Sequence, residues 1–156
     1  TLKSFGGLPH RLKLIRTIKG MKFYNDSAST NPETAAAAIA SFPNQPKILI
    51  MGGKDKNLDY EPVAEAAYAE DVPLVVLFGE NKKKIALALD KVVKTEPARD
   101  LELAVKLAYI EAQKLLNLKT YKLINLIFSP GAASFDMFEN YKARGEEFEK
   151  IVRSLK

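Results

Sequence analysis

The sequence predicts an α/β fold: a Rossmann-like, mostly parallel sheet with an antiparallel edge hairpin and helices on both faces. Short apolar runs alternate with amphipathic stretches along the chain, which is typical of strand–helix–strand units. Three of the apolar runs are almost continuous in Ile, Leu and Val, as expected for parallel strands covered on both faces. The first two apolar runs are separated only by Lys19 and Gly20, which predicts a hairpin.

Each predicted element follows from its local pattern. The hairpin strands are expected at 12–18 and 21–25. After them we expect helices at 31–42, 60–70, 82–90, 100–116 and 134–156, and strands at 47–53, 73–79, 91–96 and 121–130. Apolar residues three and four positions apart support the helices. Asp100 is expected to cap the fourth helix and Ser134 the fifth, because short polar side chains accept hydrogen bonds from first-turn amides.

Composition narrows the class of protein. The chain has 156 residues, which fits one domain with its own core. It has no cysteine, so disulfides and thiolate metal sites are excluded, and no apolar run approaches the length of a membrane span. The net charge of +5 comes from lysines spread along the chain, a pattern that favours small anionic ligands over nucleic acid. We expect no nucleic-acid and no membrane partner.

Four loops are candidates for binding because ligands of such sheets lie at the carboxyl ends of the strands. They contain the stretches NDSASTNP, MGGKDKNLDY, FGENKKK and SPGAASFD. Gly52, Gly53 and Gly131 permit close backbone approach. The same features also fit a solvated charged loop and a simply capped helix. There is no P-loop, and the single histidine cannot build a metal site, so the residues indicate a binding domain and no metal centre.

Four stretches, in this order and spacing, resemble one family. GLPHR, NDSASTNPE, MGGKDKNLDY and SPGAASFDMFENYKARGEEF are similar to the carboxyl-terminal domain of the Mur ligases, over nearly the whole chain from Gly7 onward. Other Mur ligases carry a segment like YAHxP or YGHHP where this chain has NDSASTNP, and the diaminopimelate-adding members carry DNPR, which is absent here. The resemblance is therefore to the members that add D-glutamate.

The resemblance implies an ATP-dependent ligase that joins D-glutamate to UDP-N-acetylmuramoyl-L-alanine in peptidoglycan precursor synthesis. ATP phosphorylates the carboxylate, and the amine of D-glutamate then displaces phosphate. The implied division is a tether at 1–6 and the carboxyl-terminal domain at 7–156, with ATP and Mg held mainly by a central domain outside this chain. We expect this chain alone to be inactive, and the protein to be a cytoplasmic monomer.

The resemblance also implies site residues. The expected D-glutamate contacts are Thr30, Lys56, Ser134, Phe135 and Tyr141, with Lys56 neutralising a carboxylate and the two hydroxyls donating hydrogen bonds. Arg11 is expected near nucleotide phosphate and Asp26 near ribose, with His10 supporting their loop. No catalytic residue and no metal ligand are expected. One position departs from the family pattern: NDSKATN is usual, and Ala28 stands where that lysine would be, so that Lys54 is a candidate to compensate.

Two other readings remain open at this point. The chain fits a stand-alone flavodoxin-like module that binds a small anionic ligand, and, less well, a nucleic-acid-binding α/β domain. A nucleic-acid-binding domain would show steeply salt-dependent duplex binding.

Overall fold

The structure is a computed structural model that describes residues 8–156. Its elements, in chain order, are β1 (Lys13–Ile18), β2 (Met21–Asn25), α1 (Pro32–Ala40), β3 (Lys47–Met51), α2 (Glu61–Ala69), β4 (Leu74–Leu77), α3 (Lys82–Ala88), β5 (Thr95–Pro97), α4 (Leu101–Asn117), β6 (Ile124–Phe128) and α5 (Tyr141–Ser154). The predicted tether at 1–6 lies outside the described residues. No helix in 8–156 is long and apolar enough to cross a membrane.

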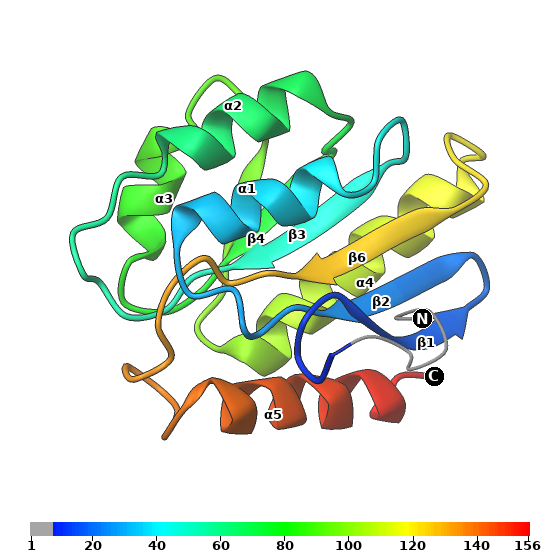
Figure 1. Cartoon of the computed structure of the whole chain (residues 1–156). Coiled ribbons are helices and arrows are strands. Elements are labelled where there is room, and N and C mark those ends of the chain that lie inside the picture. Colours follow the sequence, from blue (N-terminus) through cyan, green and yellow to red (C-terminus); the bar gives the residue numbers. More distant parts are fainter. Residues whose placement is uncertain (1–7) are drawn as a thin grey trace.

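All six of these strands lie in one sheet, in the order β1-β2-β6-β3-β4-β5. β1 pairs antiparallel with β2, and every other neighbouring pair is parallel. The predicted fold class is therefore confirmed, including the edge hairpin. The last strand of the chain, β6, lies between β2 and β3 near the middle of the sheet (Figure 1).

Helices cover both faces of the sheet, which explains why the central strands are mostly apolar. α1, α2 and α3 lie on one face, and α4 and α5 lie on the other (Figure 1). Alternate residues of β3 point to opposite faces, as the strand period requires. Ile48 and Ile50 pack with α4, and Leu49 and Met51 pack with α1 and α2.

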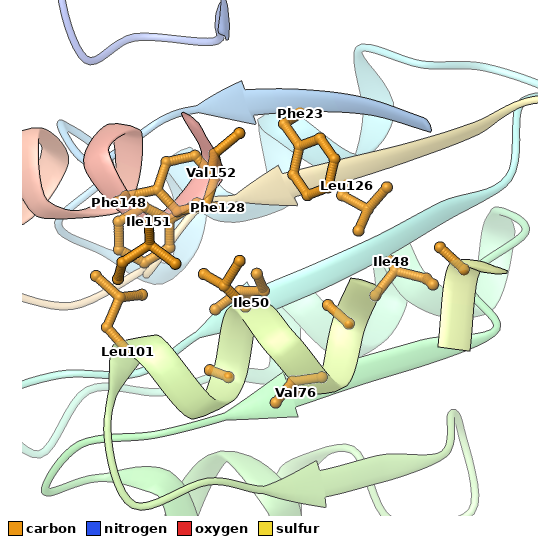
Figure 2. Packing of buried hydrophobic residues seen from close by; sticks show 14 of the residues in the cluster. Phe23, Ile48, Ile50, Val76, Leu101, Leu126, Phe128, Phe148, Ile151 and Val152 are labelled. Carbon is orange, nitrogen blue, oxygen red and sulfur yellow. The ribbon is translucent and has the colours of Figure 1, made fainter. Parts of the chain in front are cut away.

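α5 packs against the sheet and against the edge hairpin. The ring of Phe148 stacks on that of Phe128, with centroids 4.7 Å apart. Ile151 and Val152 join the same cluster (Figure 2). At the far end of α5, the Arg16 guanidinium donates to the carbonyl oxygens of Val152 at 2.9 Å and Leu155 at 2.7 Å. The last helix is thereby attached to the edge hairpin.

The start of the last helix was predicted too early. α5 begins at Tyr141 instead of 134, and its cap is Asn140, whose side chain accepts from the amide of Ala143 at 2.8 Å. Ser134 is therefore not the cap. Its carbonyl oxygen accepts from the amides of Met137 and Phe138 in a turn, so the segment 134–140 forms a loop.

The fifth strand was also misplaced. β5 covers Thr95–Pro97 instead of 91–96. Lys91 has a left-handed backbone with φ of 64°, which ends any extended run there, and Val92 and Val93 pack into the core from a turn. The Asp100 cap is confirmed, because its side chain accepts from the amide of Leu103 at 2.9 Å.

Candidate functional site

The four candidate loops meet at one edge of the sheet. They follow β2, β6, β3 and β4, which are neighbours in that order, and all four strands end at the same side. Direct hydrogen bonds join the loops: the amide of Gly131 donates to Ser29, that of Gly52 to Pro130, and that of Lys54 to Ala133. The convergence expected from the topology is present.

A buried polar network fixes the backbone of three of these loops. The hydroxyl of Tyr60 donates to the carbonyl of Gly131 at 2.8 Å and accepts from the amide group of Asn81 at 2.8 Å. The Asn81 side-chain oxygen in turn accepts from the amide of Gly53 at 2.9 Å. Burial raises the pKa of Tyr60 to about 12, so the phenol stays protonated and keeps donating.

Close packing at the strand ends requires glycine. Gly52 has φ of 125°, and a Cβ there would collide with the backbone carbonyl of Phe78. The loops after β3 and β4 therefore approach each other more closely than any side chain would allow.

The buried Arg144 side chain joins the loops after β2 and β6 by hydrogen bonds. Its side chain is 1% exposed. It donates to the hydroxyl of Ser27 at 3.0 Å, to the carbonyl of Ser27 at 2.8 Å and to that of Ala132 at 2.9 Å. Burial lowers its pKa to about 10, against the Coulombic attraction of Asp136, so the guanidinium remains charged at neutral pH.

Asp26 holds the start of β1 against the end of β6. Its carboxylate accepts from the amide of Leu12 at 3.0 Å and from the hydroxyl of Ser129 at 2.7 Å. Burial raises its pKa to about 6, and those two hydrogen bonds and the nearby Arg11 charge oppose the rise. This carboxylate has a structural task beside the ribose contact expected for it.

Two of the residues predicted to contact D-glutamate, Lys56 and Phe135, lie next to each other. The Lys56 ammonium is 5.6 Å from the centre of the Phe135 ring, which is 64% exposed. Ser134, next to that ring in the chain, is buried. The nearby lysines Lys54 and Lys84 form ion pairs, whereas Lys56 forms none within residues 8–156. The loop thus presents one cation to solvent beside an aromatic ring.

The remaining predicted contacts border the same edge. Thr30 is exposed at the end of the loop after β2, one residue before the Asn31 cap of α1. Tyr141 is partly exposed at the first position of α5, and its carbonyl accepts from the hydroxyl of Ser27 at 2.7 Å. Both residues are at the loop edge, and within residues 8–156 neither of them forms a hydrogen bond or ring contact with Lys56.

The expected nucleotide residues share a small cavity between the start of the loop after β2 and α1. Arg11 and Asp26 both line this cavity of about 160 Å³, together with Thr34 and other residues of α1. Arg11 also lines a larger cavity of about 480 Å³ with Ala28 and Lys142. Lys54 lies elsewhere, 3.2 Å from Glu80. The Lys54 ammonium thus pairs with the loop after β4, and Lys54 lines neither of these two cavities. That Lys54 compensates for the missing cation at position 28 stays a prediction.

Ion pairs hold the loop 54–59, which contains no helix or strand. Glu80 accepts from the amide of Asp55 at 2.9 Å, and that hydrogen bond lowers the pKa of Glu80. The amide of Asn57 donates to the carboxylate of Asp55, and this hydrogen bond lowers the pKa of Asp55. The Asp55 carboxylate also forms an ion pair with Lys84 at 3.0 Å. In the described residues no group of three His, Asp or Glu side chains is placed to hold a metal ion.

Three supporting residues escaped the sequence analysis: Tyr60, Asn81 and Arg144. Tyr60 and Arg144 stand inside the quoted motifs, but a motif does not say which of its side chains are buried. The signal for Arg144 was a cation on the apolar face of a helix, one turn before Phe148. His10 does support its loop: its carbonyl accepts from the amide of Ala28 at 2.8 Å, and its ring is 2.9 Å from the Asn25 side-chain nitrogen.

Solved structures with a similar fold include a folylpolyglutamate synthase and a ligase that acts on UDP-N-acetylmuramate. A Mycobacterium tuberculosis folylpolyglutamate synthase, complexed with ADP and AMPPCP, aligns with a TM-score of 0.65 at 16% identity, over 90% of this chain and 32% of that one. A UDP-N-acetylmuramate-alanine ligase from Thermotoga maritima aligns with a TM-score of 0.57 at 14% identity, over 99% of this chain and 32% of that one. At such identities the likeness concerns the fold.

Curated relatives found by sequence have a higher identity to this chain than these solved structures. A UDP-N-acetylmuramoylalanine--D-glutamate ligase of Natranaerobius thermophilus is 45% identical over 99% of this chain, and one of Clostridium botulinum is 38% identical over 97%. The chain spans 32% of the length of each of these curated relatives. They give no support to a stand-alone flavodoxin-like module.

The family described as "Mur ligase, glutamate ligase domain" matches residues 10–116, which include the loops after β2, β3 and β4. The expected resemblance is confirmed, and the chain belongs to the Mur ligase family, within its glutamate ligase domain.

Proposed function

We propose that this chain is the amino-acid-binding domain of an ATP-dependent ligase that joins D-glutamate to UDP-N-acetylmuramoyl-L-alanine. The names of its relatives support the reaction. The observation that carries the local assignment is the convergence of Lys56, Phe135 and Ser134 at the carboxyl edge of the sheet. In this proposal ATP and Mg bind mainly outside this chain, and the ligase works as a monomer in the cytoplasm, where nucleotide substrates are made.

The proposed task of the edge is to bind and orient the amine donor. D-Glutamate carries two carboxylates, and the Lys56 ammonium is an exposed cation that neutralises one of them. The hydroxyls of Ser134 and Thr30 are the donors proposed for carboxylate oxygens. Phe135 and Tyr141 supply walls that limit the positions of the aliphatic part. Holding the amine in place converts its attack on an acyl phosphate into an effectively unimolecular step.

The side of the site that carries Ser134 is fixed before any ligand arrives. Arg144 and Tyr60 hold the backbone of that loop through the carbonyls of Ala132 and Gly131. A preformed backbone reduces the ordering cost of binding a small polar ligand. The edge therefore suits a substrate with few atoms, whose binding energy would otherwise be consumed by loop ordering.

Replacing Lys56 tests the proposal. In the ligase polypeptide that contains this chain, Lys56→Ala is expected to raise the apparent KM for D-glutamate about 10- to 150-fold, the equivalent of a charge-assisted hydrogen bond of roughly 1.5–3 kcal/mol. The KM for ATP should move much less. Lys56→Arg should restore only part of the loss, because a planar fork replaces a compact ammonium. Ser134→Ala and Thr30→Ala should act in the same direction, more weakly.

Lys54→Ala is the matched control, since Lys54 lies in the same loop but pairs with Glu80. It should leave the KM for D-glutamate near the wild-type value. A thermal melt of each variant shows whether the fold is retained. If Lys56→Ala and Lys54→Ala change the KM for D-glutamate equally, or not at all, the role given to Lys56 is wrong.

A further inference from the structure

We propose that Glu80 is a positioning residue that keeps the Lys56 ammonium beside the Phe135 ring. The amide of Glu80 donates to the carboxylate of Asp136, the neighbour of Phe135, at 3.0 Å. Its own carboxylate accepts from the amide of Asp55, the neighbour of Lys56, at 2.9 Å. One residue thus joins the two loops that carry the pair. The inference rests on the proposed function for the meaning of the pair, but the contacts of Glu80 stand independently of it.

The bond between Glu80 and Asp136 crosses the end of a strand. Glu80 follows β4 and Asp136 follows β6, and β3 lies between these two strands in the sheet. The loop that carries Lys56 begins at this end of β3. The approach is so close that position 79 requires glycine: Gly79 has φ of 86°, and a Cβ there would lie 2.7 Å from the amide nitrogen of Gly53 and 2.9 Å from the Asp136 carboxylate. The loop after β4 therefore contacts both of the loops that carry the pair.

The bond between Glu80 and Asp55 restrains the backbone next to Lys56. The same hydrogen bond lowers the pKa of Glu80, so the carboxylate is ionised at neutral pH, and it also lies 3.2 Å from the Lys54 ammonium. On its other side Asp55 pairs with Lys84 at 3.0 Å. The Lys56 side chain forms no ion pair within residues 8–156, so its place beside the ring depends on this restrained neighbour.

The exposure of Glu80 argues against a main role in stability. Its side chain is 45% exposed, and solvent screens ion pairs of this kind. What the side chain fixes is local, namely the distance between the loop 54–59 and the loop after β6. Without it, D-glutamate would have to order the loop 54–59 on binding. Such a cost weakens the ground state and the transition state alike, so it raises KM and leaves kcat unchanged.

Steady-state kinetics of the ligase polypeptide that contains this chain test the role of Glu80. Glu80→Ala is expected to raise the KM for D-glutamate about three- to tenfold, as for the loss of one exposed hydrogen bond and ion pair, with kcat and the KM for ATP near their wild-type values. Glu80→Gln keeps an acceptor for the amide of Asp55 and should recover most of the loss. Glu65→Ala, which removes an exposed glutamate of α2, is the control and should have no effect.

A positioning role also predicts that the effect of Glu80 depends on Lys56. In a Lys56→Ala background, Glu80→Ala should raise the KM for D-glutamate no further, because the two side chains act through one contact. Equal fold-changes in the two backgrounds would overturn the proposal. So would a wild-type KM for Glu80→Ala, or a Glu80→Gln variant as impaired as Glu80→Ala.

Proton NMR of the 156-residue chain follows the pair without any ligand. The Phe135 ring should shift the ε-methylene protons of Lys56, with Phe135→Leu as the reference that lacks the ring. Glu80→Ala should reduce this shift and Glu80→Gln should keep it, while both variants melt near the wild-type Tm. An unchanged shift in Glu80→Ala would overturn the positioning role. If Lys56→Ala leaves the KM for D-glutamate unchanged, the proposed function fails instead, and the proton shift still decides the role of Glu80.

Discussion

The two loops that carry the proposed D-glutamate contacts are built in opposite ways. The loop after β6 is buried from Ser129 to Ser134 and rests on the Arg144 guanidinium. The loop 54–59 is largely exposed and is held by ion pairs at its rim. Buried hydrogen bonds to a charged group contribute more than exposed ion pairs, because solvent screens the latter. Position is therefore fixed on one side of the site, and the other side is free to adjust.

The largest difference is expected on removing the buried anchor. Arg144→Met keeps the length of the side chain but leaves the carbonyls of Ser27 and Ala132 without their donor. We expect a loss of about 3–5 kcal/mol in the free energy of unfolding, because buried groups lose charge-assisted hydrogen bonds. Urea unfolding measures it. Arg144→Lys should recover part of the loss, and a wild-type value for Arg144→Met would show that the guanidinium is not the anchor.

A second difference is expected in the pH dependence of stability. Burial raises the pKa of Asp26 to about 6, above the unfolded value near 3.8, so the folded state holds a proton that the unfolded state has released. The contribution of protonated Asp26 to the free energy of unfolding is complete below pH 3.8. It is lost as the pH rises through 6, which lowers the free energy of unfolding by about 2–3 kcal/mol. Asp26→Asn should lack this loss.

Unfolding in urea at several pH values measures the Asp26 contribution as the difference between wild type and variant. The exposed Asp90→Asn should follow the wild type across the range. A difference between wild type and Asp26→Asn that stays constant from pH 4 to pH 7 would contradict the assignment of the titration to Asp26.

The smallest effect on stability is expected in the exposed loop. Glu80→Gln keeps a hydrogen-bond acceptor for the amide of Asp55 and removes the ion pair with Lys54. We expect no measurable change in Tm, but faster amide hydrogen exchange across 54–59. Loss of Tm on the scale of Arg144→Met would remove the contrast between the two loops.

The sequence was sufficient for the parts of the fold that depend on local pattern. Continuous apolar runs predicted β3, β4 and β6, and Lys19–Gly20 predicted the hairpin, because strand burial and turn chemistry are written in neighbouring residues. The start of α5 was missed because Ser134 resembles a cap, and only its tertiary contacts show that Asn140 has that role. The position of β5 was missed because Val92 and Val93 have strand propensity but lie in a turn, from which they pack partly buried against the core.

The candidate site divides in the same way. The loops and their common edge follow from topology, and the residues proposed to touch ligand came from a resemblance of motifs. The supports could not be predicted, because the partners of Arg144 lie 12 and 117 residues away in the chain. The neighbourhood of Ala28 and Lys142 likewise depends on where the first turn of α5 lies, which was the element predicted least well.

The position of β6 in the sheet has a consequence for the order of folding. β6 pairs with both β2 and β3, although it follows β2 by about a hundred residues, as in the register Met21 to Ile124. While a ribosome is still making the chain, the β1–β2 hairpin and the β3–β4–β5 unit have no strand to join them, and two apolar edges stay open. Such long-range closure slows folding and prolongs the exposure of those edges to aggregation. We expect a synthesis intermediate halted before Ile124 to bind chaperones, and release to coincide with the emergence of β6.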